Sequence, residues 1–314
     1  MIKKFDLTNG AIAASNRENS TILVCISPDS AEKELLIKNY NVDEHTLSSA
    51  LDPDEISRLE FELDHVAIIF KRPTNRSAED ELLFKVCSIG IFKFKDSLIV
   101  VSSDDFPFFE GRQFLRVASL NEVLIKLLGR TIYHYFEHLR IINMISGEIE
   151  QKVNQSMENK YLIHMFTLGK SLVYYLNSIN ANSMVIEKLK YNAGKLGITK
   201  EELEALDDLV IDNTQCYKQA EIYSNVLSSL MDARAGVVNN NLNVLIKRLT
   251  IINIVFMPLN LIAGIGGMSE YSMMTRHISW KVAYGCFSFS MVLLGLLVYV
   301  IISRIGREKT KLKK

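Results

Sequence analysis

The spacing of hydrophobic and polar residues divides the chain into stretches of different character. Within residues 1–112, short β-branched and aromatic runs predict strands at Thr21–Ser27 and His65–Lys71 and a two-stranded hairpin over Leu82–Ser103. The segment Asp43–Phe61 has acidic residues at helical spacing and predicts a helix. We therefore expect a compact α/β domain here, in which helices cover a sheet.

Beyond this domain the apolar pattern becomes helical. One apolar face predicts a first helix from Leu120 to Ile149, and a second helix is predicted over Glu158–Tyr191 before a break at Asn192–Ile198. Ser119 with Glu122, and Thr199 with Glu202, have the spacing of a capping box, in which each side chain satisfies a backbone donor of the first turn.

The third helix has no convincing stop between Thr199 and the glycine-rich stretch that ends at Gly267. It would be on the order of 100 Å long at the usual rise per residue. Pro258 is tolerated if this part lies in a membrane, because neighbouring helices satisfy the freed carbonyl. These helices form the predicted cytoplasmic stalk domain, residues 113–248. Within it, a seven-residue repeat in the third helix predicts packing along the helix axis, against a neighbouring chain or the protein's own helices. It comprises Leu203, Val210, Tyr217, Ser224, Met231, Val238 and Leu245.

Two apolar runs near the C-terminus predict a transmembrane hairpin. Leu249–Met268 and Val282–Ile302 contain no charged residue, and each is long enough to cross about 30 Å of hydrocarbon. They would form the membrane domain 249–302, with an outer loop at 269–281 and a basic tail at 303–314. Basic residues flank the hairpin on its N- and C-terminal sides, which predicts that both termini face the cytoplasm.

Composition narrows the function classes only slightly. The 36 basic and 36 acidic residues balance, so total charge identifies no partner and gives no reason to expect nucleic acid. Four scattered cysteines fit a reducing compartment better than a disulfide framework. The sequence contains no phosphate-binding glycine loop and no nucleophile elbow, so we do not expect an enzyme. His134 and His138 have zinc-ligand spacing, but no third ligand is evident and a polar helix face is the favoured interpretation.

The first apolar run carries a polar stripe at alternating spacings of three and four. It comprises Thr250, Asn253, Met257, Asn260, Gly264 and Gly267, and the same spacing extends backwards to Asn243 and Ile246. Polar groups in hydrocarbon are costly unless they face a partner or water. The stripe is therefore either a hydrogen-bonded seam between helices or the wall of a pore formed by several copies. In a pore, a ring of Asn260 amides would suit a cation that keeps part of its water shell, as Mg2+ does.

The stretch LTIINIVFMPLNLIAGIGGMSE, residues 249–270, resembles the first membrane helix of the CorA family of divalent metal-ion transporters. Met257–Leu259, Ile262–Ile265 and Gly267–Met268 match the family's run, whose closing Gly-Met-Asn is Gly-Met-Ser here. The order of α/β domain, stalk helix, two spans and basic tail is similar too. The resemblance implies a funnel-shaped homo-oligomer, usually a pentamer, in a bacterial cytoplasmic membrane. It also implies transport of divalent cations, Mg2+ first, with no cofactor.

The resemblance assigns roles to particular residues. It implies that the pore-facing residues are Asn243, Ile246, Leu249, Asn253, Met257, Asn260 and Gly264, and that Gly267, Met268, Ser269 and Glu270 form the outer mouth. Ser269 stands where the family has asparagine; Glu270 could supply a carboxylate ring there or be a solvated loop residue.

Asp208 and Asp232 lie where the family places stalk carboxylates that bind a regulatory metal ion. The usual acidic partners correspond to Ser48 and Ser49, with Asp52 and Asp54 nearby, so this sensor is incomplete. Asp208 is then an ordinary solvated acid in the favoured interpretation. The basic tail is expected to meet anionic lipid headgroups or the inner end of the pore.

Three functions remain open at this stage. The first is channel-like transport of divalent cations. The others are proton-coupled transport of zinc or another transition metal, and a non-conducting membrane scaffold or ion sensor.

Overall fold

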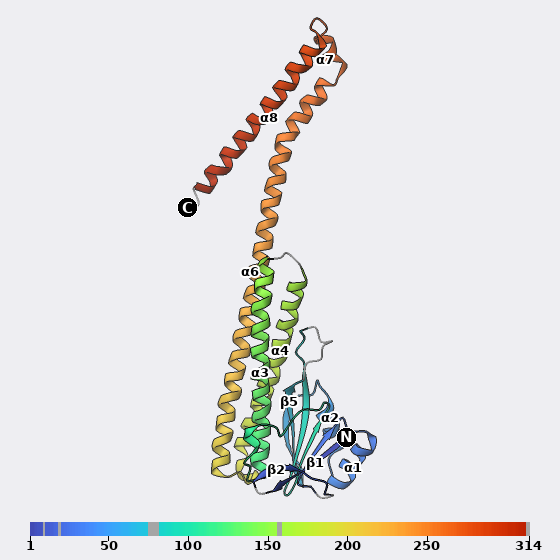
Figure 1. The fold of residues 1–314 in the computed structure, drawn as a ribbon, viewed down its shortest axis with the longest axis vertical. Coiled ribbons are helices and arrows are strands. Elements are labelled where there is room, and N and C mark those ends of the chain that lie inside the picture. The colour runs from blue at the N-terminus through green and yellow to red at the C-terminus, as the bar shows by residue number, and fades with distance from the viewer. Residues whose placement is uncertain (9, 18–19, 75–81, 156–158, 312–314) are drawn as a thin grey trace. The chain divides into compact units, whose positions relative to one another are not determined.

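The structure is a computed structural model of the whole chain, in which residues 1–8, 10–17, 20–74, 82–155 and 159–311 are described. Side chains are described within these ranges except at 112, 153–155, 159, 270–272 and 301–311. The chain divides into two compact units, Met1–Met231 and Asp232–Lys314 (Figure 1). The domain boundaries predicted at residues 112 and 248 stay predictions.

The first unit contains a seven-stranded sheet of order β2-β1-β3-β7-β6-β5-β4. Its strands are β1 Ile2–Thr8, β2 Ala11–Ala14, β3 Ile22–Ile26, β4 Arg58–Phe61, β5 His65–Pro73, β6 Val86–Phe94 and β7 Leu98–Ser102. β3 and β7 pair in parallel, and the other described pairs are antiparallel. The predicted strands at Thr21–Ser27 and His65–Lys71 and the predicted hairpin are confirmed.

Three strands were missed, and one predicted helix was too long. β2 and β4 are the two edge strands and β1 lies next to β2, and these partly exposed strands carry enough polar residues to hide the alternation. In the segment Asp43–Phe61, only Glu44–Leu51 is helical, as α2. Pro53 explains where this helix stops, because proline disfavours helical backbone at the residue before it, and Asp52 is extended.

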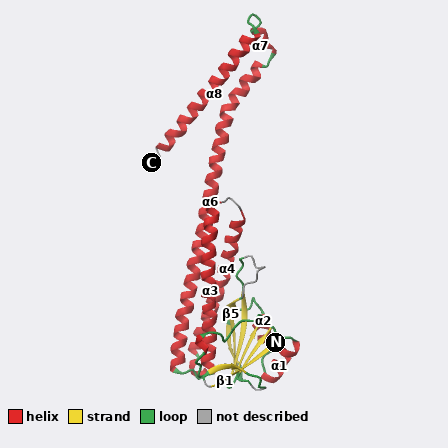
Figure 2. Cartoon of the chain, in the orientation of Figure 1, coloured by secondary structure: helices red, strands yellow, loops and turns green. Residues whose placement is uncertain are grey.

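Helices cover both faces of the sheet (Figure 2). α1 Ser30–Tyr40 and α2 pack on one face, against alternate strand residues such as Leu23, Ile69 and Val101. The neighbouring residues of the same strands point to the opposite face and join the core formed by the long helices. α2 lies so close to β6 that a Cβ added at Gly90 would sit 2.4 Å from the Cβ of Ala50.

The long helices are α3 Leu120–Gln155, α4 Asn159–Tyr191 and α6 Lys200–Gly266, with the short α5 Ala193–Leu196 before α6. All three predicted helices are confirmed. The Thr199 box is complete: the Thr199 N–H donates to the Glu202 carboxylate at 2.8 Å, and the Glu202 N–H donates to Thr199 Oγ1 at 3.2 Å. In the Ser119 box, Glu122 accepts instead from the N–H of Ala118, at 2.7 Å.

The predicted seven-residue repeat lies close to the packed side of α6, but the residues it names are not the buried ones, so its register was wrong. The buried stripe comprises Leu206, Leu209, Asn213, Cys216, Ala220 and Leu227. The predicted residues Val210, Tyr217 and Met231 lie beside this stripe and are partly buried against the same core. An α-helix has 3.6 residues per turn, so a strict seven-residue series drifts slowly around the helix surface. The stripe that packs against α3 and α4 is therefore the one beside the predicted series.

The polar face predicted at His134 and His138 was also wrong. Both imidazoles are buried: His134 stacks on Phe106, with ring centroids 5.0 Å apart, and His138 Nδ1 lies 2.6 Å from the Tyr175 hydroxyl. Burial lowers the pKa of His134 to about 3, and the nearby His138 adds to the shift. The loop after β7 supplies Phe106, so this environment depends on residues distant in sequence.

Candidate functional site

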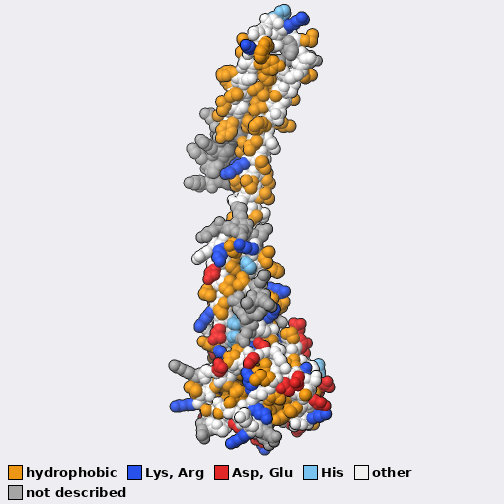
Figure 3. Space-filling view, turned by 45° about the vertical axis from the view of Figure 1, so that its right-hand side comes forward, with side chains coloured by type: hydrophobic (Ala, Val, Ile, Leu, Met, Phe, Trp, Pro, Cys, Tyr) orange, Lys and Arg blue, Asp and Glu red, His pale blue; other side chains and the backbone are white. Residues whose placement is uncertain are grey.

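The second unit contains two helices that are long and apolar enough to cross a membrane, judged by length and composition: the C-terminal part of α6 and the segment Trp280–Val300 of α8 Trp280–Lys311. Only 6% of each apolar window is buried within the chain. In Figure 3, hydrophobic side chains cover most of the drawn surface of these helices. Because an exposed apolar surface of this extent is unfavourable in water, lipid or further copies of the chain must cover it.

One stripe of α6 packs against α8. Its residues are less exposed than their neighbours and share one side of the helix: Ile251, Val255, Pro258, Leu259, Ile262 and Gly266. A Cβ added at Gly266 would lie 2.5 Å from the Phe287 ring, and one added at Gly295 would lie 3.3 Å from the Leu259 side chain. Glycines thus allow the two spans to approach closely, as is common in membrane helix pairs.

The stripe predicted to face a pore is a different one. Asn243, Ile246, Leu249, Asn253, Met257, Asn260 and Gly264 are all exposed in the single chain. Met257 is 76% exposed, and a Cβ added at Gly264 would meet no other atom within 4 Å. The amides of Asn253 and Asn260 are therefore not buried between the chain's own two spans.

The residues predicted for the outer mouth lie where α6 ends. Gly267 and Met268 connect α6 to the short helix α7 Ser269–Met274. The Gly267 N–H donates to the Ala263 carbonyl at 3.1 Å, and the Met268 N–H donates to the Ile265 carbonyl at 3.1 Å. Ser269 is exposed, whereas the side chain of Glu270 lies outside the described residues.

An aromatic side chain lies at the N-terminal end of α8, the end that follows α7. Trp280 is 69% exposed at the first position of the helix, and the Lys281 ammonium lies 5.9 Å from its ring centroid. An exposed tryptophan beside a lysine is typical of the interface between hydrocarbon and headgroups.

The stalk carboxylates predicted to bind metal are exposed and far apart in the chain. Asp208 belongs to the first unit and Asp232 to the second. The neighbouring Asp207 is engaged elsewhere, in an ion pair with Lys190 at 2.6 Å. Within the described ranges, no three His, Cys, Asp or Glu residues form a group that could hold a metal ion. A metal role for Asp208 and Asp232 stays a prediction.

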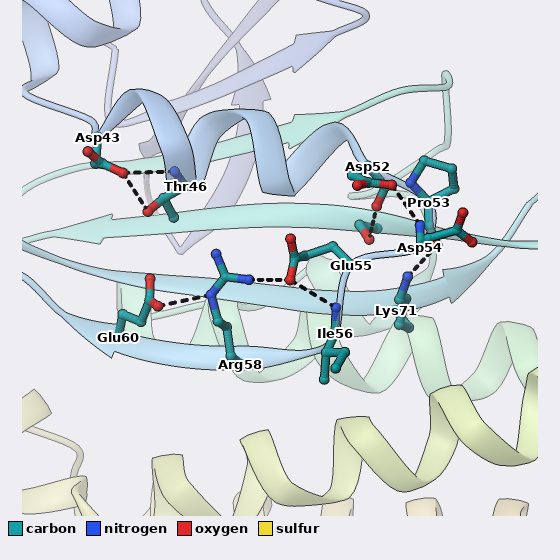
Figure 4. A network of polar contacts seen from close by, with 11 residues as sticks. Asp43, Thr46, Asp52, Pro53, Asp54, Glu55, Ile56, Arg58, Glu60 and Lys71 are labelled. Carbon is teal, nitrogen blue, oxygen red and sulfur yellow. Dashed lines mark hydrogen bonds and ion pairs between the residues drawn. The ribbon is translucent and has the colours of Figure 1, made fainter.

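The acidic turn after α2 has contacts that the sequence did not reveal (Figure 4). Ser48 is exposed and Ser49 buried, and the Asp52 carboxylate accepts a hydrogen bond from the Asp54 N–H at 2.9 Å. Arg58 pairs with the Glu55 carboxylate at 2.6 Å and also with Glu60.

The Lys71 ammonium donates to the Pro53 carbonyl of the same turn, and the Lys71 side chain is buried. Burial lowers the pKa of Lys71, while the carboxylate of Asp54 acts in the opposite direction. In the sequence, Lys71 and Arg72 are two consecutive charged residues at the end of an apolar strand. This pattern was the available sign that buried charged groups lie there.

Asn182 on α4 holds the strand that carries Lys71. β4 pairs with β5 only as far as Ile69, which leaves the backbone of Lys71 without a strand neighbour on that side. The fully buried Asn182 replaces it: its carbonyl accepts from the Lys71 N–H at 2.9 Å, and its amide donates to the Lys71 carbonyl at 2.7 Å. The Ser57 hydroxyl also donates to the side-chain oxygen of Asn182, at 2.8 Å.

Comparison with known proteins decides the family. The sequence profile described as CorA-like Mg2+ transporter protein matches residues 18–304. The chain belongs to this family. Among CorA relatives, the cobalt/magnesium transport protein CorA of Methanocaldococcus jannaschii is 28% identical over 255 residues, which cover 78% of each chain. The magnesium transport protein CorA of Escherichia coli is 21% identical over 322 residues, covering 97% of this chain and 99% of the relative.

Solved structures show the same fold. The complete CorA magnesium transporter of Methanocaldococcus jannaschii matches with a TM-score of 0.78 at 24% identity, over 96% of each chain. Full-length CmaX matches with a TM-score of 0.70 at 14% identity, over 85% of this chain and 86% of that chain. The fold is an N-terminal α/β domain, a long helix and two C-terminal helices of membrane-spanning character, as predicted.

Proposed function

We propose that this chain transports divalent metal cations, Mg2+ first, across a membrane through a homo-oligomeric pore lined by the membrane part of α6. The observation that carries the proposal is the exposed amide stripe. α8 packs on another side of α6, and the amides of Asn253 and Asn260 remain available to an aqueous path or to other copies. The relatives named as cobalt or magnesium transport proteins support the same function.

The number of copies follows from geometry and from the family. Two spans cannot enclose an aqueous path, so several copies must surround an axis. We propose a pentamer, the number that the CorA resemblance implies. Each Asn260 then contributes to a ring of amide oxygens that suits a hydrated divalent cation, and Met257 contributes an apolar ring that can close by dewetting.

Placement in the membrane completes the proposal. Both termini face the cytoplasm of a bacterial cell, Ser269 and Glu270 surround the outer mouth, and the basic tail lies at anionic lipid headgroups. The CorA resemblance implies metal-binding roles for Asp208 and Asp232 on the stalk. Import then needs neither ATP nor covalent chemistry, because moving a doubly charged ion across 100 mV supplies about 4.6 kcal/mol.

Substitution of Asn260 tests the pore. In liposomes, Asn260→Leu should lower Mg2+ flux at least about tenfold, because an apolar ring replaces oxygen ligands. The oligomer size in detergent should be unchanged. Asn260→Gln, the matched control, keeps the amide and should retain most of the flux.

Other outcomes would identify the alternatives. Loss of the oligomer in Asn260→Leu would mean that this amide holds helices together in a scaffold. Zn2+ flux that stops when a proton uncoupler is added would favour proton-coupled zinc transport. If purified wild-type protein passes no divalent cation at any Mg2+ concentration, the transport proposal fails.

A further inference from the structure

A buried ammonium group lies beneath an acidic turn in the cytoplasmic unit. The turn between α2 and β4 has carboxylates at Asp52, Asp54 and Glu55. The Lys71 side chain reaches the turn from β5, is only 6% exposed, and donates to the carbonyl of Pro53 at the centre of the turn (Figure 4). A buried ammonium group is unfavourable unless hydrogen bonds and opposite charges compensate it, and this turn supplies both.

The second cation at the turn, Arg58, pairs with other carboxylates. The Arg58 guanidinium forms ion pairs with the Glu55 carboxylate at 2.6 Å and with the Glu60 carboxylate at 2.9 Å, so it is shared between two carboxylates. Among the described residues, neither Arg58 nor Lys71 forms a direct ion pair with Asp52 or Asp54, but the carboxylates of Asp54 and Asp52 raise the pKa of Lys71 through space. Lys71 is therefore a cation that is bonded to the backbone of the turn at Pro53 and lies within electrostatic reach of these two carboxylates.

Both partners of this contact are fixed in place. Asn182 holds the Lys71 backbone by two hydrogen bonds, of 2.9 and 2.7 Å. On the turn, the Ser88 hydroxyl donates to the Asp52 carbonyl at 2.6 Å, and the Asp54 N–H is bonded to the Asp52 carboxylate at 2.9 Å. The ammonium group thus occupies a set position, in which it offsets the turn's negative charge without a mobile ion.

We propose that Lys71 is a built-in counter-cation of the acidic turn 52–55, which keeps its conformation when the cytoplasm is depleted of divalent cations. Without the ammonium group, the clustered carboxylates repel one another, and the turn becomes dependent on Mg2+ from solution. The proposal concerns the cytoplasmic unit and can hold or fail whether or not the membrane helices form a conducting pore.

Hydrogen exchange in the full-length protein tests this, because the amides of Asp54 and Glu55 are hydrogen-bonded within the turn. In wild type, exchange at 52–56 should be equal in chelator and in millimolar Mg2+. Lys71→Met keeps the apolar stem but removes the charge. In chelator, its turn should exchange at least about tenfold faster, as expected for loss of one hydrogen bond to a charged group. Mg2+ should slow this exchange again, and Na+ at matched ionic strength should not.

Two controls separate the charge from general packing. Lys71→Arg keeps a cation and should remain insensitive to Mg2+. Lys93→Met removes a half-buried lysine on β6, whose carboxylate neighbour is Glu202, and should leave the turn unchanged. The proposal is overturned if Mg2+ protects the wild-type turn, or if Lys71→Met shows neither faster exchange nor a response to Mg2+. A turn that exchanges faster but ignores Mg2+ overturns it too, since Lys71 would then be only a packing group.

Discussion

At the residue scale, buried polar side chains stabilise the fold of the first unit. Arg72 is completely buried, forms an ion pair with Asp104 and lies 4.7 Å from the centroid of the Phe106 ring. Asn182 supplies the edge of β5 with the hydrogen bonds that a strand would otherwise provide. Because a buried polar group without a partner is costly, removal of one member of such a pair should be far more damaging than its small size suggests.

Asn182→Ala should destabilise the first unit by about 2–4 kcal/mol, because it leaves the N–H and carbonyl of Lys71 buried without their partners. Thermal unfolding of the detergent-solubilised protein measures the loss. Asn180→Ala is the matched control, since Asn180 lies two residues away on α4 with an exposed side chain, and its effect should stay within about 0.5 kcal/mol. Equal effects of the two substitutions would contradict the edge role of Asn182.

His134 should make stability depend on pH. Its pKa is about 3 in the folded protein and about 6.5 in the unfolded chain, so only the unfolded state binds the proton between these values. Its contribution is fully present above about pH 6.5 and is lost as the pH falls toward 3, by a few kcal/mol in total. His134→Phe keeps an aromatic ring against Phe106. In this variant the unfolding temperature should depend less on pH between about pH 3 and 6.5 than in wild type. His45 is exposed, so His45→Gln should leave the dependence of the unfolding temperature on pH as in wild type. The same dependence in His134→Phe as in wild type would contradict the assignment to His134.

At the element scale, the two faces of α6 in the membrane segment have different neighbours. The stripe that includes Gly266 packs against α8, whereas Gly264, two residues earlier, faces open space. A periodic sequence pattern identifies both stripes, but which one the second span covers depends on how the hairpin packs.

The two glycines provide a matched pair of substitutions. Gly266→Ala puts a methyl group 2.5 Å from the Phe287 ring, so it should separate the spans and lower the unfolding temperature of the solubilised oligomer by several degrees. Gly264→Ala meets no atom within 4 Å in the chain and should leave hairpin stability unchanged. If Gly264 faces the pore, the same substitution should reduce ion flux. A hairpin that is destabilised more by Gly264→Ala than by Gly266→Ala would refute this packing.

At the scale of the whole molecule, the placement in the membrane makes a prediction about access. Cys25, Cys87 and Cys216 are buried, and burial raises the pKa of each thiol to about 12, so these groups should resist labelling in the folded protein. Cys286 is exposed in the chain and can be removed as Cys286→Ser.

In that background, Ser279→Cys lies in the predicted outer loop. In intact cells, a membrane-impermeant thiol reagent should label it, whereas Asn16→Cys in the N-terminal unit should be labelled only after the cells are opened. The reverse pattern would show that the termini face outside, and the proposed orientation would be wrong.

How much of this protein could be predicted varied with the range of the interactions involved. The β3 and β5 strands, the hairpin, the Thr199 cap and the continuous α6 depend on periodicity and local hydrogen bonds, and the sequence predicted them. β1, β2 and β4 were missed because these partly exposed strands at and next to the sheet edges carry polar residues that hide the hydrophobic alternation. The CorA resemblance, carried by Met257–Leu259 and Gly267–Met268, pointed to the correct family.

By itself, the sequence determined the three long helices, which segments are apolar enough for a membrane, and which side of α6 carries amides, since composition and a 3.6-residue period fix these properties. Only the tertiary structure decided that α8 covers the Gly266 stripe and leaves the amides free. It also decided that His134 is buried under Phe106 and that Lys71 lies beneath an acidic turn. These environments are made by residues from separate elements, and no local pattern encodes which of them meet.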